Sequence, residues 1–437
     1  MSSLTFNNNH FKMILDSQLK KFERFGINLG LERIQTLLEK LGNPHHQVPI
    51  IHVAGTNGKG SVCAYLSAIL TAANLRVGRY ISPHLVDWTE RICLNETPIA
   101  TETLQQLIQQ IQNTISPDSE SPTQFEVITA AAWLYFAEQK VDIAVMEVGL
   151  GGRLDATNVC DHPLVTVITP ISREHWQRLG PTVAHIAREK AGILKPGCPA
   201  VIAPQPPEAM AVIQKRLTEL NCPAVFPQPA QVIGPQLAVT NPRPVAFQGV
   251  QYPLPLLGDI QLLNSALAVT TIQVLQNQGW DIPNTAITTG MARTKWPGRL
   301  QWTEWRGHPL LIDGAHNPAA AQVLRQYVDS LPPQPVNWVM GMLSTKDHAD
   351  IFQALLRAGD RLWVVPVPDH SSGVPGELAK LAKIVCPELE LCQACDHLTQ
   401  GLEWACSGKN HQTVLCGSLY LIGHFFQNQA VSIAPKS

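Results

Sequence analysis

The stretch VAGTNGKGSVCA, from Val53 to Ala64, decides how the first half of this chain folds. The apolar, β-branched run that leads into it, VPIIHVAG (Val48 to Gly55), predicts a buried strand. A helix is predicted over Ser61 to Asn74, because apolar side chains recur there on one stripe. The glycines between them let the backbone turn its N–H groups inward, and the helix N-terminus and Lys59 add positive charge. Strand, loop and helix together predict a phosphate-binding unit.

The spacing of this loop departs from the usual G-x-x-x-x-G-K-[ST] pattern. Gly55 stands four residues before Lys59, and Gly60 separates Lys59 from Ser61. A glycine-rich turn that binds nothing is therefore an alternative. We favour a phosphate site, because strand, loop, lysine and helix occur in the expected order.

The composition of the chain restricts its class. With 437 residues it is long enough for two or three domains. Hydrophobic residues make up 45% and charged residues 15%, which is typical of a globular protein. The net charge of −2 and the absence of a basic tract argue against a nucleic-acid partner. No apolar run approaches the roughly 18 residues of a membrane span, so no membrane partner is expected either.

The N-terminus and the cysteines predict a cytoplasmic protein. The N-terminal 22 residues contain no signal-peptide h-region, and the ten cysteines are scattered, as expected for reduced thiols. Cys392 and Cys395 form a lone C-x-x-C. Zinc is not expected there, because Cys386, Cys406 and Cys416 do not supply the second pair that such a site needs.

Apolar runs that alternate with helical patterns predict an α/β fold with a mostly parallel sheet. In the first part of the chain, further strands are expected at 76–82, 141–149 and 163–169, and helices at 103–114, 124–139, 182–192 and 261–276. The proline-rich residues 198–257 are expected to be strand-like.

A second α/β series follows MARTKWPGRLQ (Met291 to Gln301), which we interpret as a linker or hinge. Its strand-like runs are LLIDGAH, VNWVMGM, RLWVVPV and TVLCGS. We place the boundary near Trp296. The prediction is a P-loop-type, mostly parallel sheet domain over residues 1–296 and a second, smaller Rossmann-like α/β domain over residues 297–437.

Several polar residues stand where an α/β sheet binds its ligands. Glu147 closes an apolar strand, and a carboxylate there suits the Mg²⁺ that accompanies nucleotide phosphates, although an ion pair with Arg153 is an equal alternative. Ser82 offers a hydroxyl and His175 an imidazole, but a lone serine is usually a loop residue or a cap, and such a histidine is more often structural than a ligand. Lys190 near a helix C-terminus is explained by the helix dipole alone.

Taken together, these motifs resemble the folylpolyglutamate synthase/dihydrofolate synthase family of the Mur ligase superfamily, ATP-dependent enzymes that form amide bonds. The resemblance covers nearly the whole chain. It runs through NLGLERI, VAGTNGKGS, SPHL…ERI, TQFEVITAAAW, MEVGLGGRLDATN, EH…LG…IAREKAGILK, PGRLQ, DGAHNP and CGSLYLIG. It implies that residues 1–296 form a Mur-ligase-like ATP-binding domain.

The resemblance also implies roles for individual residues. For ATP they are Thr56, Asn57, Gly58, Lys59 and Gly60 on the phosphates, Asn264 on the adenine, Arg299 on the phosphates, and Asp313, with His316 nearby, on the nucleotide. For two Mg²⁺ ions they are Ser82 and Glu147 at the first and His175 at the second. Lys190 would be carried as N6-carboxylysine, an anion able to order the second metal. Lys59, Lys190 and His175 would thus form the catalytic set.

For the pterin, the resemblance implies three segments. They are the LGL turn (Leu29, Gly30, Leu31), the TQFE segment (Thr123, Phe125, Glu126) and the LDA segment (Leu154, Asp155, Ala156). Phe125 offers an aromatic face for stacking, with ordinary core packing as the alternative.

Two departures from the family pattern concern the metal and the adenine. The family usually has Leu-Asp-His before the second metal, whereas this chain has Arg173-Glu174-His175. Glu174 keeps a carboxylate there, and Arg173 adds a cation. The family often has His-Gln before the adenine asparagine, and this chain has Ile260-Gln261.

The implied reaction activates a carboxylate. Phosphoryl transfer from ATP gives an acyl phosphate, which the amine of L-glutamate attacks; the acceptors would be dihydropteroate and tetrahydrofolate or its polyglutamates. Arg299 and Asp313 lie beyond the linker, so the site would be complete only when the domains close. A monomer is expected. Two alternatives remain open: a Mur-type ligase acting on a cell-wall precursor, and a nucleotide-dependent switch or binding protein.

Overall fold

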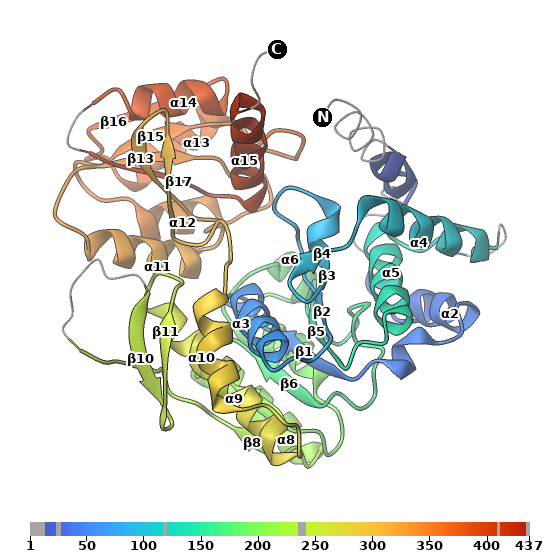
Figure 1. Ribbon diagram of the computed structural model, residues 1–437. Helices are drawn as coiled ribbons and strands as arrows, with labels where there is room; N and C mark the ends of the chain where they lie inside the picture. The colour runs from blue at the N-terminus through green and yellow to red at the C-terminus, as the bar shows by residue number, and fades with distance from the viewer. Residues whose placement is uncertain (1–13, 23–27, 117–119, 235–241, 409–410, 434–437) are drawn as a thin grey trace. The chain divides into compact units, whose positions relative to one another are not determined.

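The computed structural model describes residues 14–22, 28–116, 120–234, 242–408 and 411–433 (Figure 1). Within these, the chain up to Gly234, with Arg243–Leu254 and Leu262–Thr294, forms one unit. Pro255–Gln261 and the chain from Lys295 onward form another. The boundary at residue 296 stays a prediction, and so does the absence of a signal peptide, because residues 1–13 lie outside the described residues.

The first unit is built on a sheet whose eight strands follow the order β4-β3-β2-β5-β1-β6-β7-β8 within the described residues. The strands are β1 (Ile50–Ala54), β2 (Val77–Tyr80), β3 (Ile92–Leu94), β4 (Thr97–Pro98), β5 (Ile143–Glu147), β6 (Val165–Ile168), β7 (Ala200–Ile202) and β8 (Ala224–Val225). From β2 to β8 all neighbours are parallel, and β3 and β4 are antiparallel. The predicted mostly parallel α/β fold is confirmed.

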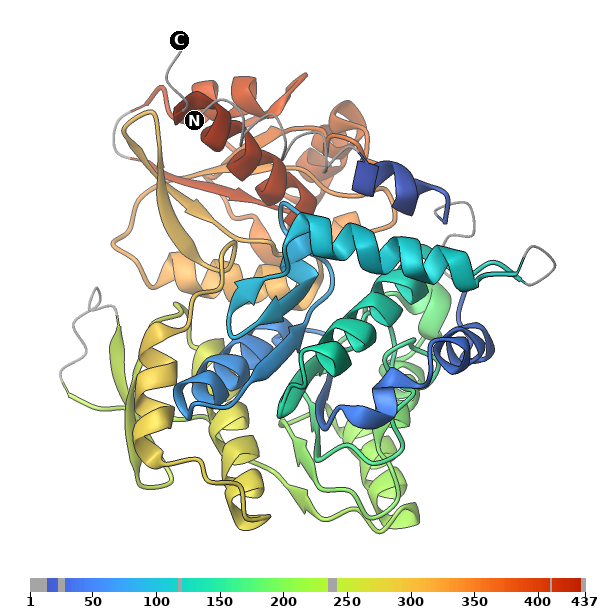
Figure 2. The ribbon, with the colours of Figure 1, turned by 45° about the vertical axis from the view of Figure 1, so that its right-hand side comes forward.

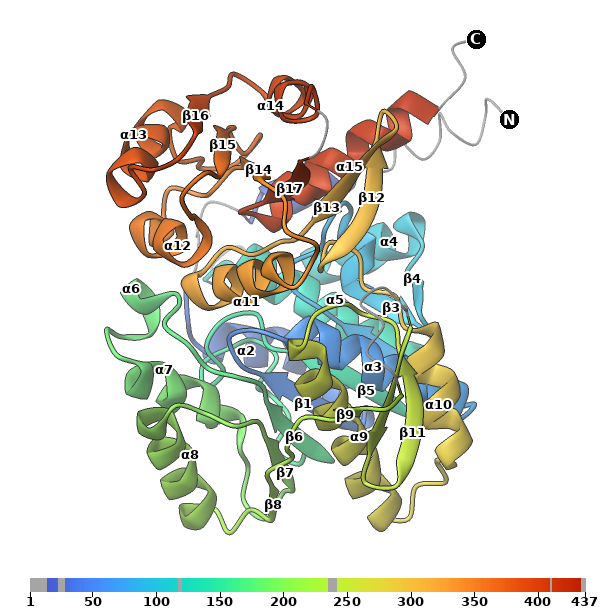
Figure 3. The same cartoon turned by 90° about the vertical axis from the view of Figure 1, so that its left-hand side faces the viewer.

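Helices cover this sheet and form its cores. They are α2 (Glu32–Lys40), α3 (Lys59–Ala72), α4 (Thr101–Thr114), α5 (Gln124–Glu138), α6 (Trp176–Leu179), α7 (Val183–Lys190), α8 (Pro207–Glu219), α9 (Ile260–Asn277) and α10 (Asn284–Arg293), with short 3₁₀ turns η2 (Pro44–Gln47), η3 (Trp88–Arg91) and η4 (Ala191–Ile193). The teal helices α4 and α5 pack with α2 in one core (Figure 2). The green helices α7 and α8 lie beside β7 and β8 in another (Figure 3).

The strand-like prediction for residues 198–257 was wrong in part, because Pro207–Glu219 is the helix α8. Its signals are local: a proline at the first turn, then Ala209, Ile213 and Leu217 four residues apart, all buried. The later part of the segment does form strands, β9 (Gln231–Val232), β10 (Arg243–Phe247) and β11 (Val250–Leu254), in a small antiparallel sheet.

The second unit holds a sheet of six strands in the order β12-β13-β17-β14-β15-β16, again within the described residues. Its elements are β12 (Gln301–Trp305), β13 (His308–Ile312), α11 (Pro318–Asp329), β14 (Val336–Met340), α12 (His348–Leu355), β15 (Arg361–Val364), α13 (Pro375–Val385), β16 (Leu391–Ala394), α14 (Leu398–Ala405), β17 (Gln412–Cys416) and α15 (Leu419–Ile433). All pairs are parallel except β12 with β13. The four strands predicted here are present, and β12 and β16 were missed.

The predicted linker is shorter than expected. α10 continues to Arg293 and β12 starts at Gln301, so the irregular part is residues 294–300. Gly290 anchors α10, because a Cβ there would meet the Ile69 backbone at 2.4 Å. Among the residues that the structure describes, no helix has the length and apolar character needed to cross a bilayer. All ten cysteines are free thiols.

Candidate active site

The glycine-rich loop that is predicted to bind phosphate lies between the strand β1 and the helix α3, and two of its glycines are required by geometry. Gly55 has φ +145° and Gly58 has φ +92°, both in the region that favours glycine. A Cβ on Gly55 would lie 1.8 Å from Oγ1 of Thr169, and one on Gly58 would lie 2.5 Å from Oδ1 of Asn264. Because α3 starts at Lys59, the loop presents a helix N-terminus.

A Gly58→Ala substitution should therefore distort this loop. Backbone strain and the clash with Asn264 should together lower the free energy of unfolding by about 1–3 kcal/mol and weaken ATP binding. Chemical denaturation and nucleotide titration measure both effects. Gly42→Ala is the matched control, since Gly42 has φ +82° but nothing within 4 Å of a Cβ. Equal effects of the two substitutions would contradict the close approach of Asn264.

Two lysines meet at one carbonyl oxygen of the loop. Lys59 donates from Nζ to Gly55 O and to Thr56 O, each at 3.1 Å. Lys190, at the end of α7, donates from Nζ to Gly55 O at 2.6 Å. Burial, and then the Lys59 charge, lower the pKa of Lys190 to about 7, while Glu174 acts in the opposite direction. The amine of Lys190 is thus partly neutral near pH 7, and a neutral amine is a nucleophile.

Ser82 and Glu147 lie together at the carboxyl ends of the neighbouring strands β2 and β5. The backbone N–H of Ser82 donates to Oε2 of Glu147 at 3.4 Å, and Glu147 is 5% exposed. Arg91, which is also buried, donates from Nη1 to Oγ of Ser82 at 3.4 Å and from Nε to Nδ1 of His84 at 2.9 Å. The alternative that Glu147 forms an ion pair with Arg153 loses support, because Arg153 pairs with Glu189 at 3.0 Å.

His175 caps α6 with a left-handed backbone, and its side chain is 43% exposed. Its Nε2 lies 3.8 Å from Oε1 of Glu174. The guanidinium of Arg173 lies 4.7 Å over the ring of Trp176. A carboxylate thus accompanies the histidine, as predicted, and Arg173 is held against an aromatic ring.

The TQFE segment is a helix cap. The Thr123 hydroxyl accepts the N–H of Glu126 at 3.2 Å, and the Glu126 carboxylate accepts the N–H of Thr123 at 2.7 Å, the two bonds of a capping box. Arg33 of α2 pairs with Glu126 at 3.1 Å and donates to Asn28 O at 2.6 Å. Because Asn28 directly precedes Leu29, Arg33 connects the LGL turn to the start of α5.

Phe125 lies against the glycine-rich loop that follows β5. A Cβ on Gly149 would lie 2.4 Å from Cζ of Phe125, so only glycine allows this approach. The ring centroid of Phe125 is 6.2 Å from that of Tyr80, and Phe125 is only partly buried. The structure therefore brings the TQFE and GLGG segments together and leaves Phe125 partly exposed.

Asp155 is buried and organises its own loop. It accepts hydrogen bonds from Leu150 N at 2.8 Å, Thr157 N at 3.0 Å and Thr157 Oγ1 at 2.7 Å. Burial raises its pKa, and these hydrogen bonds oppose the rise. Its neighbours Leu154 and Ala156 are partly and fully buried. Most acceptor positions of the Asp155 carboxylate are thus used inside the loop.

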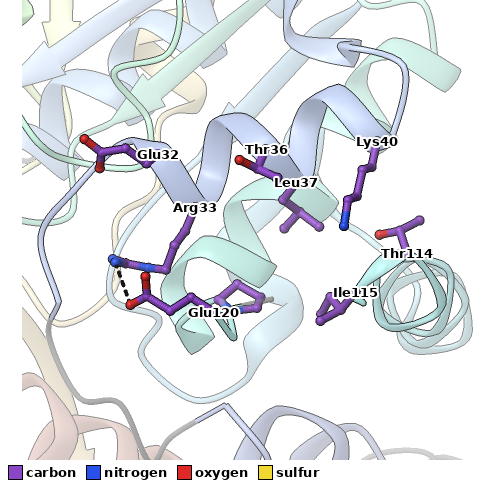
Figure 4. A pocket seen from close by; sticks show the side chains of 9 residues that line it. Glu32, Arg33, Thr36, Leu37, Lys40, Thr114, Ile115 and Glu120 are labelled. Carbon is purple, nitrogen blue, oxygen red and sulfur yellow. Dashed lines mark hydrogen bonds and ion pairs between the residues drawn. The ribbon is translucent and has the colours of Figure 1, made fainter. Parts of the chain in front are cut away.

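A cavity of about 210 Å³ lies beside the LGL turn and contains none of the predicted site residues (Figure 4). It is lined by Glu32, Arg33, Thr36, Leu37 and Lys40 of α2, and by Thr114, Ile115, Glu120 and Pro122. Arg33 and Glu120 point toward each other, 3.3 Å apart, at one end of it (Figure 4). Its charged groups have both signs, so it shows no preference for an anion.

In the second unit, Arg299 and Asp313 lie together at the carboxyl end of β13. Asp313 accepts the N–H of Leu300 and of Ala315, each at 2.8 Å. Burial raises the pKa of Asp313, and Arg299 opposes the rise. A Cβ on Gly314 would lie 2.4 Å from Nη1 of Arg299, so the guanidinium rests on that glycine. The Nδ1 of His316 donates to Gly314 O at 2.8 Å.

The structure thus groups most of the predicted residues into three sets: the loop with Lys190 and Asn264, the Ser82–Glu147 pair, and the segments around Phe125. His175 stands beside Glu174. Arg299 and Asp313 belong to the other unit. Arg33 and Arg91 were not among the candidate site residues predicted from the sequence, although Arg33 contacts Glu126 and Arg91 contacts Ser82. Both stand in the motifs NLGLERI and SPHL…ERI, but nothing local in the sequence indicates which partners these arginines take.

Comparisons with known proteins show which family this chain resembles. Residues 53–272 match the model of the Mur ligase middle domain, and residues 299–428 match that of the dihydrofolate synthetase C-terminal domain. The chain is 33% identical to the dihydrofolate synthetase of Saccharomyces cerevisiae, covering 92% of this chain and 98% of the relative. It is 32% identical to the dihydrofolate synthase/folylpolyglutamate synthase of Bacillus subtilis, covering 91% and 94%.

Solved structures show the same likeness. The folylpolyglutamate synthase of Mycobacterium tuberculosis, complexed with ADP and AMPPCP, matches with a TM-score of 0.84 and 30% identity over 95% of this chain and 98% of that chain. FolC of E. coli, in complex with DHPP and ADP, matches with a TM-score of 0.82 and 28% identity over 96% and 98%.

Proposed function

The chain belongs to the dihydrofolate synthase/folylpolyglutamate synthase family of Mur ligases, and from this premise we propose that it joins L-glutamate to dihydropteroate and to folate glutamates at the expense of ATP. The observation that carries the proposal is the pair Lys59 and Lys190 on the Gly55 carbonyl of a phosphate-binding loop. The family favours this reading over a ligase for cell-wall precursors and over a nucleotide-dependent switch.

The loop residues place the phosphates of ATP. The backbone N–H groups from Gly58 to Gly60, at the start of α3, and the Lys59 ammonium would hold the phosphates, so that the γ-phosphoryl group faces the acceptor carboxylate. The N–H groups of Thr56 and Asn57 instead donate to Pro170 O, at 3.0 and 3.3 Å. Transfer gives an acyl phosphate and ADP. The α-amino group of L-glutamate then attacks the acyl carbon, a tetrahedral intermediate collapses, and phosphate leaves. Asn264 would hold the adenine, and Arg299 and Asp313 would contact the nucleotide, as the resemblance implies.

The residues present fit magnesium. Among the described residues no three His, Cys, Asp or Glu side chains are grouped to hold a metal alone. Mg²⁺ instead prefers one or two carboxylates plus phosphate oxygens and water, and the adjacent Ser82 and Glu147 suit it. Ser82 and Glu147 would hold the first ion and His175, with Glu174, the second. When bound, such ions neutralise charge on the transferring phosphoryl group.

Lys190 would serve the second ion as a carbamate. Its neutral amine can add CO₂ and release a proton to solvent, so that a carbamate anion would stand where an ammonium cation stood beside Lys59. The change would replace the repulsion between the buried Lys190 cation and the partly exposed Lys59 cation by attraction, which supports the modification physically.

The pterin would be held near Phe125, with the LGL, TQFE and LDA segments around it. Phe125 supplies a partly exposed aromatic ring, and Asp155 keeps the LDA loop in shape through its internal hydrogen bonds. Asp155→Ala should therefore raise the KM for dihydropteroate and also loosen the loop. The monomeric state and the cytosolic location remain predictions.

Both acceptors should support turnover. With saturating Mg·ATP and L-glutamate, we expect ADP release with dihydropteroate and with tetrahydrofolate, each strictly dependent on glutamate. The reason is that the pterin-side segments and the phosphate loop belong to one unit, so that either acceptor can present its carboxylate to the same phosphate. Turnover with tetrahydrofolate but not with dihydropteroate would contradict the proposed addition of glutamate to dihydropteroate. ADP release without glutamate would favour a nucleotide switch.

A further inference from the structure

Two cysteines lie at the amino ends of β7 and β8, and a third, Cys160, lies near one of them, in the unit that carries the glycine-rich loop but outside the site described above. β7 and β8 pair in the register Ala200 with Ala224, and Cys198 and Cys222 each stand two residues earlier. Side chains two residues apart in extended chain share a face of the sheet. The register therefore places Cys198 and Cys222 opposite each other on one face.

A single carbonyl oxygen joins the two residues. Lys195 O accepts the backbone N–H of Cys198 at 3.1 Å and the thiol of Cys222 at 3.1 Å. The ladder continues with Ala200 N donating to Pro223 O at 2.8 Å. Neighbouring strands lie about 4.7–4.9 Å apart, inside the Cα separation of about 4.4–6.8 Å that a disulfide bridges.

The environment suits thiol chemistry better than a metal. Cys198 is 8% exposed, whereas Cys222 and the third cysteine, Cys160, are partly exposed. Burial raises the pKa of the Cys198 thiol, the Cys222 thiol raises it further, and Lys195 opposes both. No group of three ligands that could hold a metal occurs among the described residues, these cysteines included.

We propose that Cys198 and Cys222 form a reversible intrachain disulfide, which makes this pair a modification site for low-molecular-weight disulfides such as oxidised glutathione. The thiolate of the more exposed Cys222 attacks one sulfur of oxidised glutathione and releases the first glutathione thiolate. The Cys198 thiolate then attacks the Cys222 sulfur of the mixed disulfide and releases the second. Two protein thiols are oxidised, one disulfide is reduced, and both protons end on glutathione.

The disulfide would close the loop that contains α8 and tie the segment after Lys190 to the start of β8. Since closing a loop restricts the unfolded chain, the oxidised protein should melt higher, by on the order of 5 °C.

The test is to incubate the full chain with oxidised glutathione, map the peptides by mass spectrometry and record melting curves. We expect a Cys198–Cys222 linked peptide, a higher Tm, and reversal of both by dithiothreitol. After the same incubation, the variants Cys198→Ser and Cys222→Ser should keep the Tm of the reduced protein and form no linked peptide. Cys160→Ser, which alters the third cysteine, should behave as the wild type. Linkage through Cys160, or only glutathione adducts on the wild-type chain, would overturn the proposal.

Discussion

Replacing Lys190 by alanine should reduce kcat by roughly 10²–10³-fold while the protein stays folded. The variant loses the Nζ contact to the Gly55 carbonyl, and with it the carbamate that we propose at this position. Small carboxylates such as acetate or formate should restore part of the activity, because they can occupy the space of the missing anion. ADP release at saturating substrates measures both effects, and Lys215→Ala, an exposed lysine of α8, is the control.

The pH dependence tests the same residue. The folded pKa of Lys190 is about 7, below its ordinary value of 10.5, so protonation disfavours the folded state. This penalty is full below pH 7 and disappears as the pH rises from 7 toward 10.5. CO₂ adds only to the neutral amine, so activity should fall below about pH 7 and in CO₂-depleted buffer. ¹³CO₂ NMR that finds only a free amine in active enzyme would refute the carbamate.

Glu147→Gln should lower turnover by roughly 10³-fold at ordinary Mg²⁺ concentrations. The amide keeps the shape of the side chain but removes the charge that a hard cation requires. Glu147 is 5% exposed at the end of β5, and its Oε2 accepts the Ser82 N–H, so a neutral side chain should be accommodated without loss of fold. The measurement is ADP release over a Mg²⁺ titration, beside metal binding followed by calorimetry.

Glu138→Gln is the matched control for this substitution, because Glu138 is an exposed glutamate at the end of α5. It should leave both the rate and the affinity for Mg²⁺ unchanged. Near-normal turnover of Glu147→Gln with unaltered Mg²⁺ affinity would exclude Glu147 as a ligand. The proposed ligase activity would then stand without this metal assignment.

Two interpretations of the local sequence pattern were wrong or incomplete. The prolines between 198 and 257 suggested strands, yet Pro206 and Pro207 begin α8, because a proline at the first turn loses no hydrogen bond. TQFE was interpreted only through a resemblance, although Thr123 and Glu126 carry the sequence signature of a capping box.

The sequence by itself determined the phosphate loop and the order of strands and helices around it, because backbone freedom at glycine and the periodicity of apolar residues act over a few residues. Only the tertiary structure decided which distant groups meet there. The order of strands in the sheet places Ser82 next to Glu147, and helix packing brings Lys190 to the Gly55 carbonyl and Asn264 to Gly58. These contacts depend on register and on the burial of whole faces, which no local pattern encodes.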